Sequence, residues 1–335
     1  MHRIGQHLIA LIALSGVSLA EESYFKAGSP DIQRYKVTPD VVFGKGKVIK
    51  DGKEATKDLW MDIYYPVEDS DEPRPAVVLA YGGAFHRGHP RIPYVGFDSQ
   101  TTTMSQYAMR YAEEGFVCFT ISYRVAPDNP IPSPYEGFEE DDLDTSLLEE
   151  KTSIDQANAI RRQMKLEELT EDNVADVMKG TIVSAAQDVR LAIRHIKESG
   201  EKYGIDPDRI ALGGFSAGAV SSVNVAYGMQ EEVAAVFINS GYPSVFDMNR
   251  LMKPDSKLPP ILIFLAQNDY PVVFESLSPF LERLKALDVD HSLNWIPGYG
   301  HFYPSGVTSL SGKGDKMSVE QRTIRFLRKH LRKTP

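Results

Sequence analysis

Short apolar runs that alternate with helical patterns constrain the fold of this chain more than any other feature. Several runs are apolar throughout, as in Ala76–Ala80 and Ile261–Ala266. Uninterrupted apolar runs suit strands that are buried on both faces of a parallel sheet. The predicted strands are Leu59–Tyr65, Ala76–Ala80, Phe116–Tyr123, Ile210–Gly213, Ala234–Asn239, Ile261–Ala266 and Ser292–Ile296.

Helical spacing of apolar residues fills the stretches between these runs. The helical patterns lie near residues 102–114, 181–199, 217–229, 274–287 and 318–332. Strands that alternate with helices predict βαβ units and a mostly parallel, doubly wound α/β sheet. The segment 35–66 has no helical pattern, so we expect antiparallel edge strands there. Because one α/β domain of this length is ordinary, we expect residues 21–335 to form a single domain.

The first twenty residues have the pattern of a secretory signal peptide. Arg3 gives a basic start, residues 8–19 form an apolar run, and Ser18 and Ala20 are small residues before a cleavage point. The run is shorter than the roughly 20 apolar residues of a permanent membrane span. We therefore predict that residues 1–20 are removed and that the mature protein is secreted or periplasmic, without stable membrane insertion.

An acidic insertion, residues 125–180, interrupts the alternation and contains no strand pattern. It carries 15 Asp and Glu against 5 Lys and Arg, a net of −10, whereas the whole chain has a net charge of −9. An acidic balance argues against a nucleic-acid partner, which requires clustered Lys and Arg. Because the insertion follows a strand's carboxyl end, where α/β sheets place ligands, we expect a lid or pocket wall. Pro132, Tyr135 and Phe138 are the candidate apolar wall residues. A solvated surface excursion is the alternative.

Helical spacing of apolar residues begins near the end of the insertion. It runs from Thr170, a possible cap, to Ile196, and Gly180 could divide the resulting helix.

The sequence Gly-Phe-Ser-Ala-Gly at residues 214–218 carries the strongest chemical signal. It follows the predicted strand Ile210–Gly213 and opens a helical stretch. A serine on such a strand-to-helix turn needs small neighbours, and its hydroxyl is exposed at the carboxyl end of the sheet. The N–H of Ala217 would point toward the reacting oxygen. We predict that Ser216 is a nucleophile.

An acid and a base follow Ser216 in the chain order that α/β-hydrolases require. Asp269 comes just after the strand Ile261–Ala266, and His301 lies in a glycine-rich loop after the last predicted strand. His301 would take the serine proton and return it to the leaving group. Asp269 would orient the imidazole and stabilise its charged form. Asp247 is a weaker rival for the acid.

A glycine turn after the strand Ala76–Ala80 predicts an anion hole. The N–H groups of Gly83 and Ala84, together with that of Ala217, would donate to a tetrahedral oxyanion. The neighbouring side chains of His86, Arg87 and His89 could line the cleft, but exposure on a loop is the favoured expectation.

With these pieces in place, the chain resembles α/β-hydrolase-fold carboxylesterases, and is similar to hormone-sensitive-lipase-like and secreted bacterial esterases of acetyl or feruloyl type. The resemblance spans residues 60–330 and implies the α/β-hydrolase fold and an acyl-enzyme on Ser216. Two positions depart from the family pattern, since Tyr81 replaces the usual His and Phe215 replaces an Asp found in many relatives. The matching segments are Asp62–Pro66, Tyr81–Phe85, Tyr123–Pro127, Asp206–Ile210, the serine turn, Asp269 and His301.

Three functions remain open at this stage. The favoured one is a serine esterase acting on a small-molecule ester or an acylated polysaccharide. The alternatives are a serine peptidase of prolyl-oligopeptidase type and a non-catalytic relative that only binds.

No cofactor or metal is expected, because no His, Asp and Glu cluster has metal-ligand spacing. The only cysteine, Cys118, is expected in the core, and the basic residues 325–333 are expected on a solvated helix face. The sequence leaves the oligomeric state open.

Overall fold

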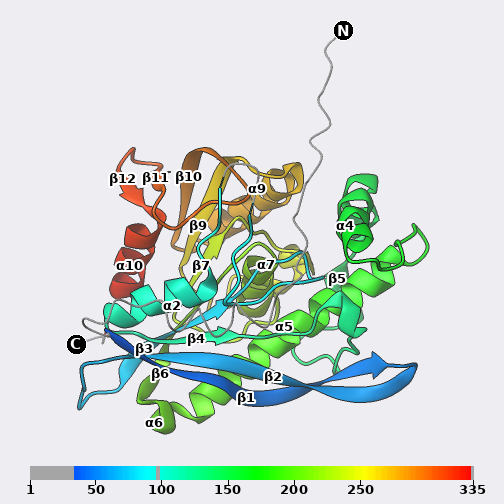
Figure 1. The fold of residues 1–335 in the computed structure, drawn as a ribbon. Helices are drawn as coiled ribbons and strands as arrows, with labels where there is room; N and C mark the ends of the chain where they lie inside the picture. Colours follow the sequence, from blue (N-terminus) through cyan, green and yellow to red (C-terminus); the bar gives the residue numbers. More distant parts are fainter. Residues whose placement is uncertain (1–33, 96–98, 333–335) are drawn as a thin grey trace.

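The computed structural model describes residues 34–95 and 99–332 (Figure 1). The predicted signal peptide, residues 1–20, lies outside the described residues. Within the part of the chain that is described, no helix is both long and apolar enough to pass through a bilayer.

A ten-stranded sheet forms the centre of the molecule, with the strand order β1-β2-β4-β3-β6-β7-β9-β10-β11-β12. Neighbouring strands from β4 to β10 in this order are parallel, whereas β1 and β2 at one end and β11 and β12 at the other pair antiparallel. The prediction of a mostly parallel α/β sheet is confirmed. The strands are β1 (Tyr35–Lys50), β2 (Lys53–Pro66), β3 (Arg74–Ala80), β4 (Val117–Ile121), β6 (Ile205–Phe215), β7 (Ala235–Asn239), β9 (Ile261–Asn268), β10 (His291–Gly300), β11 (Thr308–Ser311) and β12 (Lys316–Ser318).

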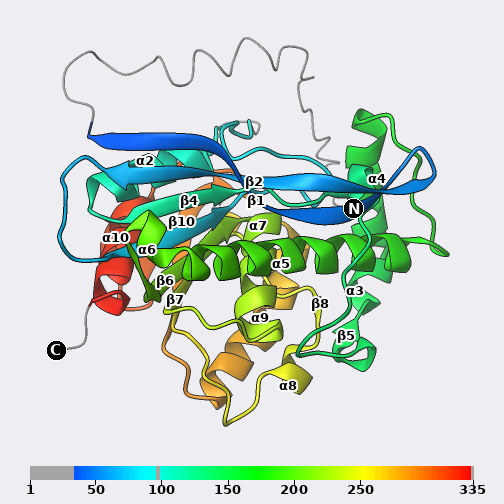
Figure 2. The same cartoon turned by 90° about the horizontal axis from the view of Figure 1, so that it is seen from below.

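Helices cover both faces of this sheet (Figures 1 and 2). The connection from β3 to β4 steps one way along the sheet and the later connections step the other way, so right-handed crossovers place their helices on opposite faces. On one face lie α2 (Met104–Glu113) and α10 (Val319–His330), joined by an ion pair between Arg328 and Glu114. The other face carries α5 (Val174–Glu198), α7 (Ala217–Val223) and α9 (Pro271–Ala286). Shorter helices are η1 (Ala126–Asp128), α6 (Gly200–Tyr203), η3 (Asn224–Gly228) and α8 (Met248–Leu251).

Each strand predicted from an apolar run is present, and the segment 35–66 forms the expected antiparallel edge pair. The strands β11 and β12 escaped prediction because they are short and mostly polar. The helix expected from Thr170 begins instead at Val174 and runs unbroken through Gly180. Buried side chains at Met178 and Ile182 flank Gly180, and their packing outweighs the cost of about 1 kcal/mol for glycine in a helix.

The acidic insertion folds into short elements rather than an irregular loop. The prediction that it contains no strand was wrong, because β5 (Leu143–Asp144) pairs with β8 (Val245–Phe246). A two-residue strand whose partner is so distant along the chain leaves no local pattern. Between η2 (Glu140–Asp142) and α5 lie α3 (Ser146–Glu149) and α4 (Lys151–Gln163), and Figure 1 shows α4 standing clear of the sheet. We call residues 143–163 the cap.

A buried ion pair fixes the start of the insertion to the sheet. Arg124, just after β4, donates from Nη2 to Asp188 on α5 at 2.7 Å, and both side chains are at most 3% exposed. The same guanidinium donates to the carbonyls of Lys47 and Ile131. A Cβ on Gly46 would lie 2.3 Å from the Arg124 Nε, so only glycine fits beside it. These contacts hold the chain where it leaves the carboxyl end of β4.

Candidate active site

Ser216 occupies the sharp turn that the sequence predicts. It joins the end of β6 to the start of α7 with φ 53° and ψ −120°, a conformation that is strained for any residue except glycine. Its N–H donates to the carbonyl of Asn239 at the end of β7, at 2.9 Å, and its carbonyl accepts from Val220 within α7. The turn is thus held from both sides.

Close backbone contacts explain why positions 214 and 218 of the motif are both glycine. A Cβ on Gly214 would lie 2.5 Å from the backbone of Gly218, and a Cβ on Gly218 would lie 2.1 Å from the carbonyl oxygen of Ala80. Real Cβ atoms do not approach backbone so closely, so any larger residue would push α7 away from the sheet. The close approach lets Ser216 sit at the carboxyl edge of the sheet.

Ser216, His301 and Asp269 form one continuous line of hydrogen bonds. The distance from His301 Nε2 to Ser216 Oγ is 2.8 Å, and that from His301 Nδ1 to Asp269 Oδ1 is 2.6 Å. Asp269 directly follows β9 and His301 directly follows β10, so adjacent parallel strands deliver both side chains to the same edge. An ionised carboxylate only accepts, so Nδ1 carries the ring proton and Nε2 can accept the serine proton. This arrangement can perform general base chemistry on a hydroxyl.

The carboxylate of Asp269 is buried but fully hydrogen-bonded. Besides His301, it accepts from the Ser240 hydroxyl at 2.5 Å and from the N–H of Tyr270 at 2.9 Å. Burial alone would raise the pKa of Asp269, but the interaction with His301 and the hydrogen bonds from His301, Ser240 and Tyr270 together lower it. The residue is therefore held in its charged form.

Aromatic rings surround the imidazole of His301. The ring centroids of Tyr270, Phe302 and Phe215 lie 4.5, 5.1 and 5.2 Å from it. His301 itself is only 8% exposed. Phe215 stands where many related esterases have Asp, and here its ring restricts the imidazole and packs against Gly82 in the turn after β3.

The predicted anion-hole residues are only partly brought together. Ala84 and Ala217 line the same cavity as Ser216, whereas Gly83 is not in that lining. Gly83 has φ 126°, and an added Cβ would lie 1.8 Å from the carbonyl oxygen of Arg87, so its glycine is needed for the turn. Tyr81, at the position of the usual His, stacks on Tyr123 with ring centroids 4.4 Å apart.

A cavity of about 170 Å³ opens beside Ser216 and His301. It is smaller than the roughly 300–1,000 Å³ of drug-sized ligand pockets. Residues of the cap, among them Leu148, Ala157 and Ile160, contribute to its wall. The apolar lining side chains are Phe85, Leu147, Leu148, Ala157, Ile160, Met178, Ile182, Val220, Tyr242, Tyr270, Val272 and Val273.

Ser240 and the cap residues of this cavity were not predicted from the sequence. The predicted wall residues Pro132, Tyr135 and Phe138 are not in its lining, and Phe138 instead packs against Tyr135 and Phe246. Ser240 follows β7, so its place after a central strand was the only available signal. The rival acid Asp247 lies elsewhere, since its carboxylate accepts from the N–H groups of Asn249 and Arg250 and caps α8. The prediction that His86 is exposed was wrong, since it is 1% exposed and contacts Arg161 on α4. It is not among the residues that line the cavity.

Neither the cysteine nor a metal-binding cluster was expected to contribute to this site. Cys118 is buried in β4, as expected, and burial raises the pKa of its thiol well above the usual value. Across residues 34–95 and 99–332, no group of three or more His, Cys, Asp and Glu side chains is arranged to hold a metal ion.

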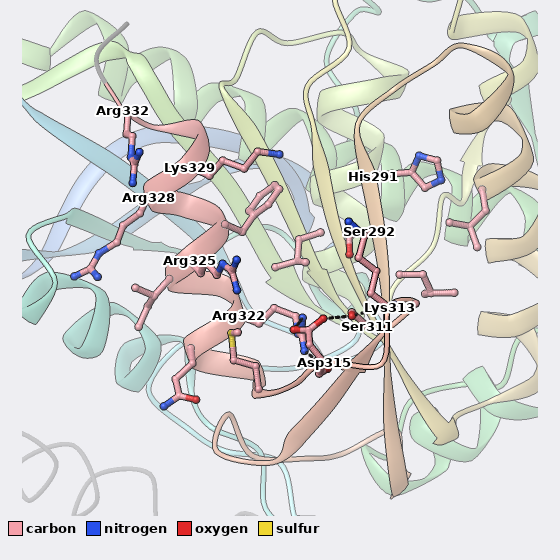
Figure 3. Close-up of a pocket in the computed structure, with 18 of the residues that line it drawn as sticks. His291, Ser292, Ser311, Lys313, Asp315, Arg322, Arg325, Arg328, Lys329 and Arg332 are labelled. Carbon is pink, nitrogen blue, oxygen red and sulfur yellow. Dashed lines mark hydrogen bonds and ion pairs between the residues drawn. The ribbon is translucent and has the colours of Figure 1, made fainter. Parts of the chain in front are cut away.

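A larger groove of about 1520 Å³ lies between α9, α10 and β10, and its lining includes none of the three hydrogen-bonded residues above (Figure 3). Basic side chains of α10 line one side of this open groove. Arg325, Arg328, Lys329 and Arg332 are exposed, as expected for a solvated basic face, and Lys333 lies outside the described residues. Arg328 and Lys329 are paired with Glu114 and Asp290.

Solved structures support the fold assignment. Thermogutta terrifontis esterase 2 phosphorylated by paraoxon is 17% identical over 90% of this chain and 95% of its own, with a TM-score of 0.52. The propionate-bound structure of the Est2 esterase from the same Planctomycetes species is 17% identical over the same shares, with a TM-score of 0.51. At such identity the likeness shows the fold alone. No curated protein sequence matches the chain.

A family model supplies the remaining comparison. The model described as the dienelactone hydrolase family matches residues 94–331, which include Ser216, Asp269 and His301. This match covers more than half of the chain. The chain therefore belongs to the dienelactone hydrolase family of α/β-hydrolase-fold enzymes.

Proposed function

We propose that the protein hydrolyses carboxylic esters through an acyl-enzyme on Ser216, with His301 as general base and acid and Asp269 as its orienting carboxylate. The observation that carries this proposal is the hydrogen-bond line from Asp269 through His301 to Ser216, at 2.6 and 2.8 Å, at the mouth of an apolar cavity. The family name supports it, since a dienelactone is a cyclic carboxylic ester.

The reaction begins when Ser216 Oγ attacks the acyl carbon as His301 Nε2 takes the hydroxyl proton. The N–H groups of Ala84 and Ala217, with that of Gly83, are proposed to stabilise the oxyanion. The bond to the alcohol then breaks, and His301 returns the proton to the leaving oxygen. Water, activated by the same imidazole, hydrolyses the acyl-enzyme and releases the carboxylic acid.

A short acyl chain is the proposed substrate class. The cavity of about 170 Å³ has room for only a few carbon atoms beyond the reacting carbonyl. An esterase of the same fold is known with propionate bound, which supports this size. The alcohol could belong to a small molecule or to an acylated polysaccharide, because the cavity limits only the acyl side.

Hydrolysis of p-nitrophenyl esters from acetyl to decanoyl tests the proposal. We expect wild type to prefer acetyl to butyryl esters and Ser216→Ala to lose a factor of about 10⁶ in kcat, as for other serine hydrolases. The control is Ser222→Ala, which removes a buried hydroxyl that donates to the Gly218 carbonyl in its own helix. Equal activity in Ser216→Ala and wild type would overturn the proposal.

Two further outcomes separate the alternatives. Faster cleavage of a matched p-nitroanilide than of the ester would favour a peptidase of prolyl-oligopeptidase type. No turnover of esters or amides by the wild type, with ligand binding retained, would favour a non-catalytic relative. We further propose that the enzyme acts outside the cytoplasm, which the predicted signal peptide supports.

A further inference from the structure

The turn after β3 is held in an unusual conformation. Ala84 and Phe85 have φ values of 53° and 59°, in the left-handed region that costs non-glycine residues about 1 kcal/mol or more each. The Phe85 carbonyl accepts from the N–H of Ala126 at 2.7 Å. The Ala84 carbonyl accepts from His86 Nδ1, also at 2.7 Å. This carbonyl belongs to the peptide between Ala84 and Phe85. The peptide that carries the Ala84 N–H has the carbonyl of Gly83, which accepts from the backbone N–H of His86 at 3.1 Å. His86 therefore holds the peptides on both sides of Ala84.

Both ring nitrogens of His86 are occupied. Because the Ala84 carbonyl can only accept, Nδ1 must carry the proton. Nε2 lies 3.3 Å from Nη1 of Arg161, and a guanidinium can only donate, so Nε2 must be bare. His86 is thus a neutral imidazole in a single tautomer. Burial lowers its pKa, and the nearby positive charges of Arg161 and Arg87 act in the same direction, against the bond to Ala84.

Arg161 belongs to α4 in the cap, so His86 connects the turn to the cap. A second contact runs in parallel, in which Arg87 Nη1 donates to Gln163 Oε1 at 3.1 Å. The same helix lines the cavity with Ala157 and Ile160. The same helix therefore lines the space for the acyl group and contacts the side chain that bonds the Ala84 carbonyl.

We propose that His86 is a positioning residue that couples the cap to the anion hole, with Arg161 as its partner on α4. An acyl group that packs against the cap holds α4 in place, and the contact from Arg161 then fixes His86. Because the ring and the backbone N–H of His86 hold the peptides on both sides of Ala84, the Ala84 N–H stays directed at the oxyanion. Substrates that fill the cavity would be cleaved with a higher kcat for this reason. The inference rests on the proposed function, since it assumes that Ala84 donates to the oxyanion.

The test compares Arg161→Met, His86→Asn and the double variant with wild type. Methionine keeps the apolar stem of Arg161 and loses the donor, whereas asparagine can keep the donor to the Ala84 carbonyl and loses the Nε2 contact. We expect kcat on p-nitrophenyl butyrate to fall about tenfold in each single variant, since a misaligned donor costs less than the 10²–10³ of a deleted one. The KM should stay within about threefold. The double variant should lose no more than either single variant, because both break the same link.

Arg162→Met is the matched control. Arg162 is the next residue on α4, and its exposed guanidinium pairs with Glu168. The affinity for a phenylboronic acid, which forms a tetrahedral adduct with an active-site serine, should fall with kcat in Arg161→Met and stay unchanged in Arg162→Met. Binding of butyrate, a planar product, should be unaffected in both.

Amide hydrogen exchange of residues 82–88 gives a readout that does not depend on activity. Faster exchange there in Arg161→Met than in Arg162→Met supports the coupling even if the wild type cleaves no ester, in which case only the proposed function fails. If the wild type is active and Arg161→Met matches Arg162→Met in kcat, boronate affinity and exchange, the coupling is wrong. His86→Asn decides in the same way should Arg161→Met fail to fold.

Discussion

The hydroxyl of Ser240 donates a 2.5 Å hydrogen bond to Asp269 Oδ2, the carboxylate oxygen that His301 does not use. The single proton of Ser240 is committed to this bond, so the hydroxyl of Tyr303, 3.3 Å from Ser240 Oγ, must donate to Ser240 in turn. Hydrogen bonds from His301 and Ser240 thus hold both carboxylate oxygens of Asp269.

Replacing Ser240 with alanine should weaken the proposed catalysis without abolishing it. A hydrogen bond to a charged group contributes about 1.5–3 kcal/mol, and 1.4 kcal/mol corresponds to a factor of ten in rate. We therefore expect kcat/KM for p-nitrophenyl butyrate to fall roughly 10- to 100-fold in Ser240→Ala. A variant with unchanged kcat/KM would show that the carboxylate needs no support from Ser240, and Ser222→Ala again serves as the buried-serine control.

The stability of the protein should respond to the neutral state of His86. Its pKa is lowered in the folded protein, so below the ordinary value of 6.5 the unfolded chain binds more protons than the folded one. Stability conferred by neutral His86 is thus present above pH 6.5 and is lost as the pH falls below it, by at most about 1.4 kcal/mol per pH unit for one proton.

The measurement is urea unfolding of wild type and His86→Asn between pH 8 and pH 5. We expect the variant to be less stable at pH 8 and the gap to narrow toward pH 5, because only the wild type loses this contribution. The lowered pKa values of His195 and His330 affect both proteins equally and cancel in the difference. A gap that stays constant would contradict the prediction.

Breaking the buried ion pair between Arg124 and Asp188 should be costly. Asp188→Asn leaves the guanidinium of Arg124 without its countercharge in a site where both side chains are nearly inaccessible. Removing one partner of such a pair typically costs about 3–5 kcal/mol. Asp176→Asn on the same helix is the control, since the Asp176 side chain is 85% exposed. A similar midpoint of urea unfolding for the two variants would show that the buried ion pair does not stabilise the fold.

Widening the cavity should change the preferred acyl chain. Ile160 contributes to the wall from the cap, so Ile160→Ala removes apolar volume next to the proposed acyl site. We expect the optimum among p-nitrophenyl esters to lengthen by on the order of two methylene groups. Val177→Ala on α5 is an exposed control that should keep the wild-type profile, and an unchanged profile in Ile160→Ala would show that the cap does not bound the acyl group.

The N-terminal prediction can be checked independently of activity. If residues 1–20 are a signal peptide, the exported protein should begin at Glu21, as intact-mass measurement or N-terminal sequencing would reveal. Ala20→Arg should leave the segment attached, since the position before the cleavage point requires a small residue. An unprocessed N-terminus in exported wild type would refute the prediction.

The parallel sheet and its antiparallel edge could be predicted because both have local signals. The apolar runs at Ala76–Ala80 and Ile261–Ala266 read as buried strands without reference to the rest of the chain. Ser216, Asp269 and His301 were found by their places after such strands, because the carboxyl ends of parallel strands meet at one edge of the sheet. The positions of these three residues along the chain predicted that they meet only because the strands before them are parallel.

Other features have no local signal at all. The pairing of β5 with β8, the hydrogen bond from Ser240 to Asp269 and the contact between Arg161 and His86 each join residues that are far apart in sequence. The sequence by itself determined the alternation of strands and helices, the serine turn and the order of the triad candidates, since these depend on backbone propensity and steric size. Only the tertiary structure decided how the cap meets the turn after β3, because that contact depends on distances that close when the whole chain packs.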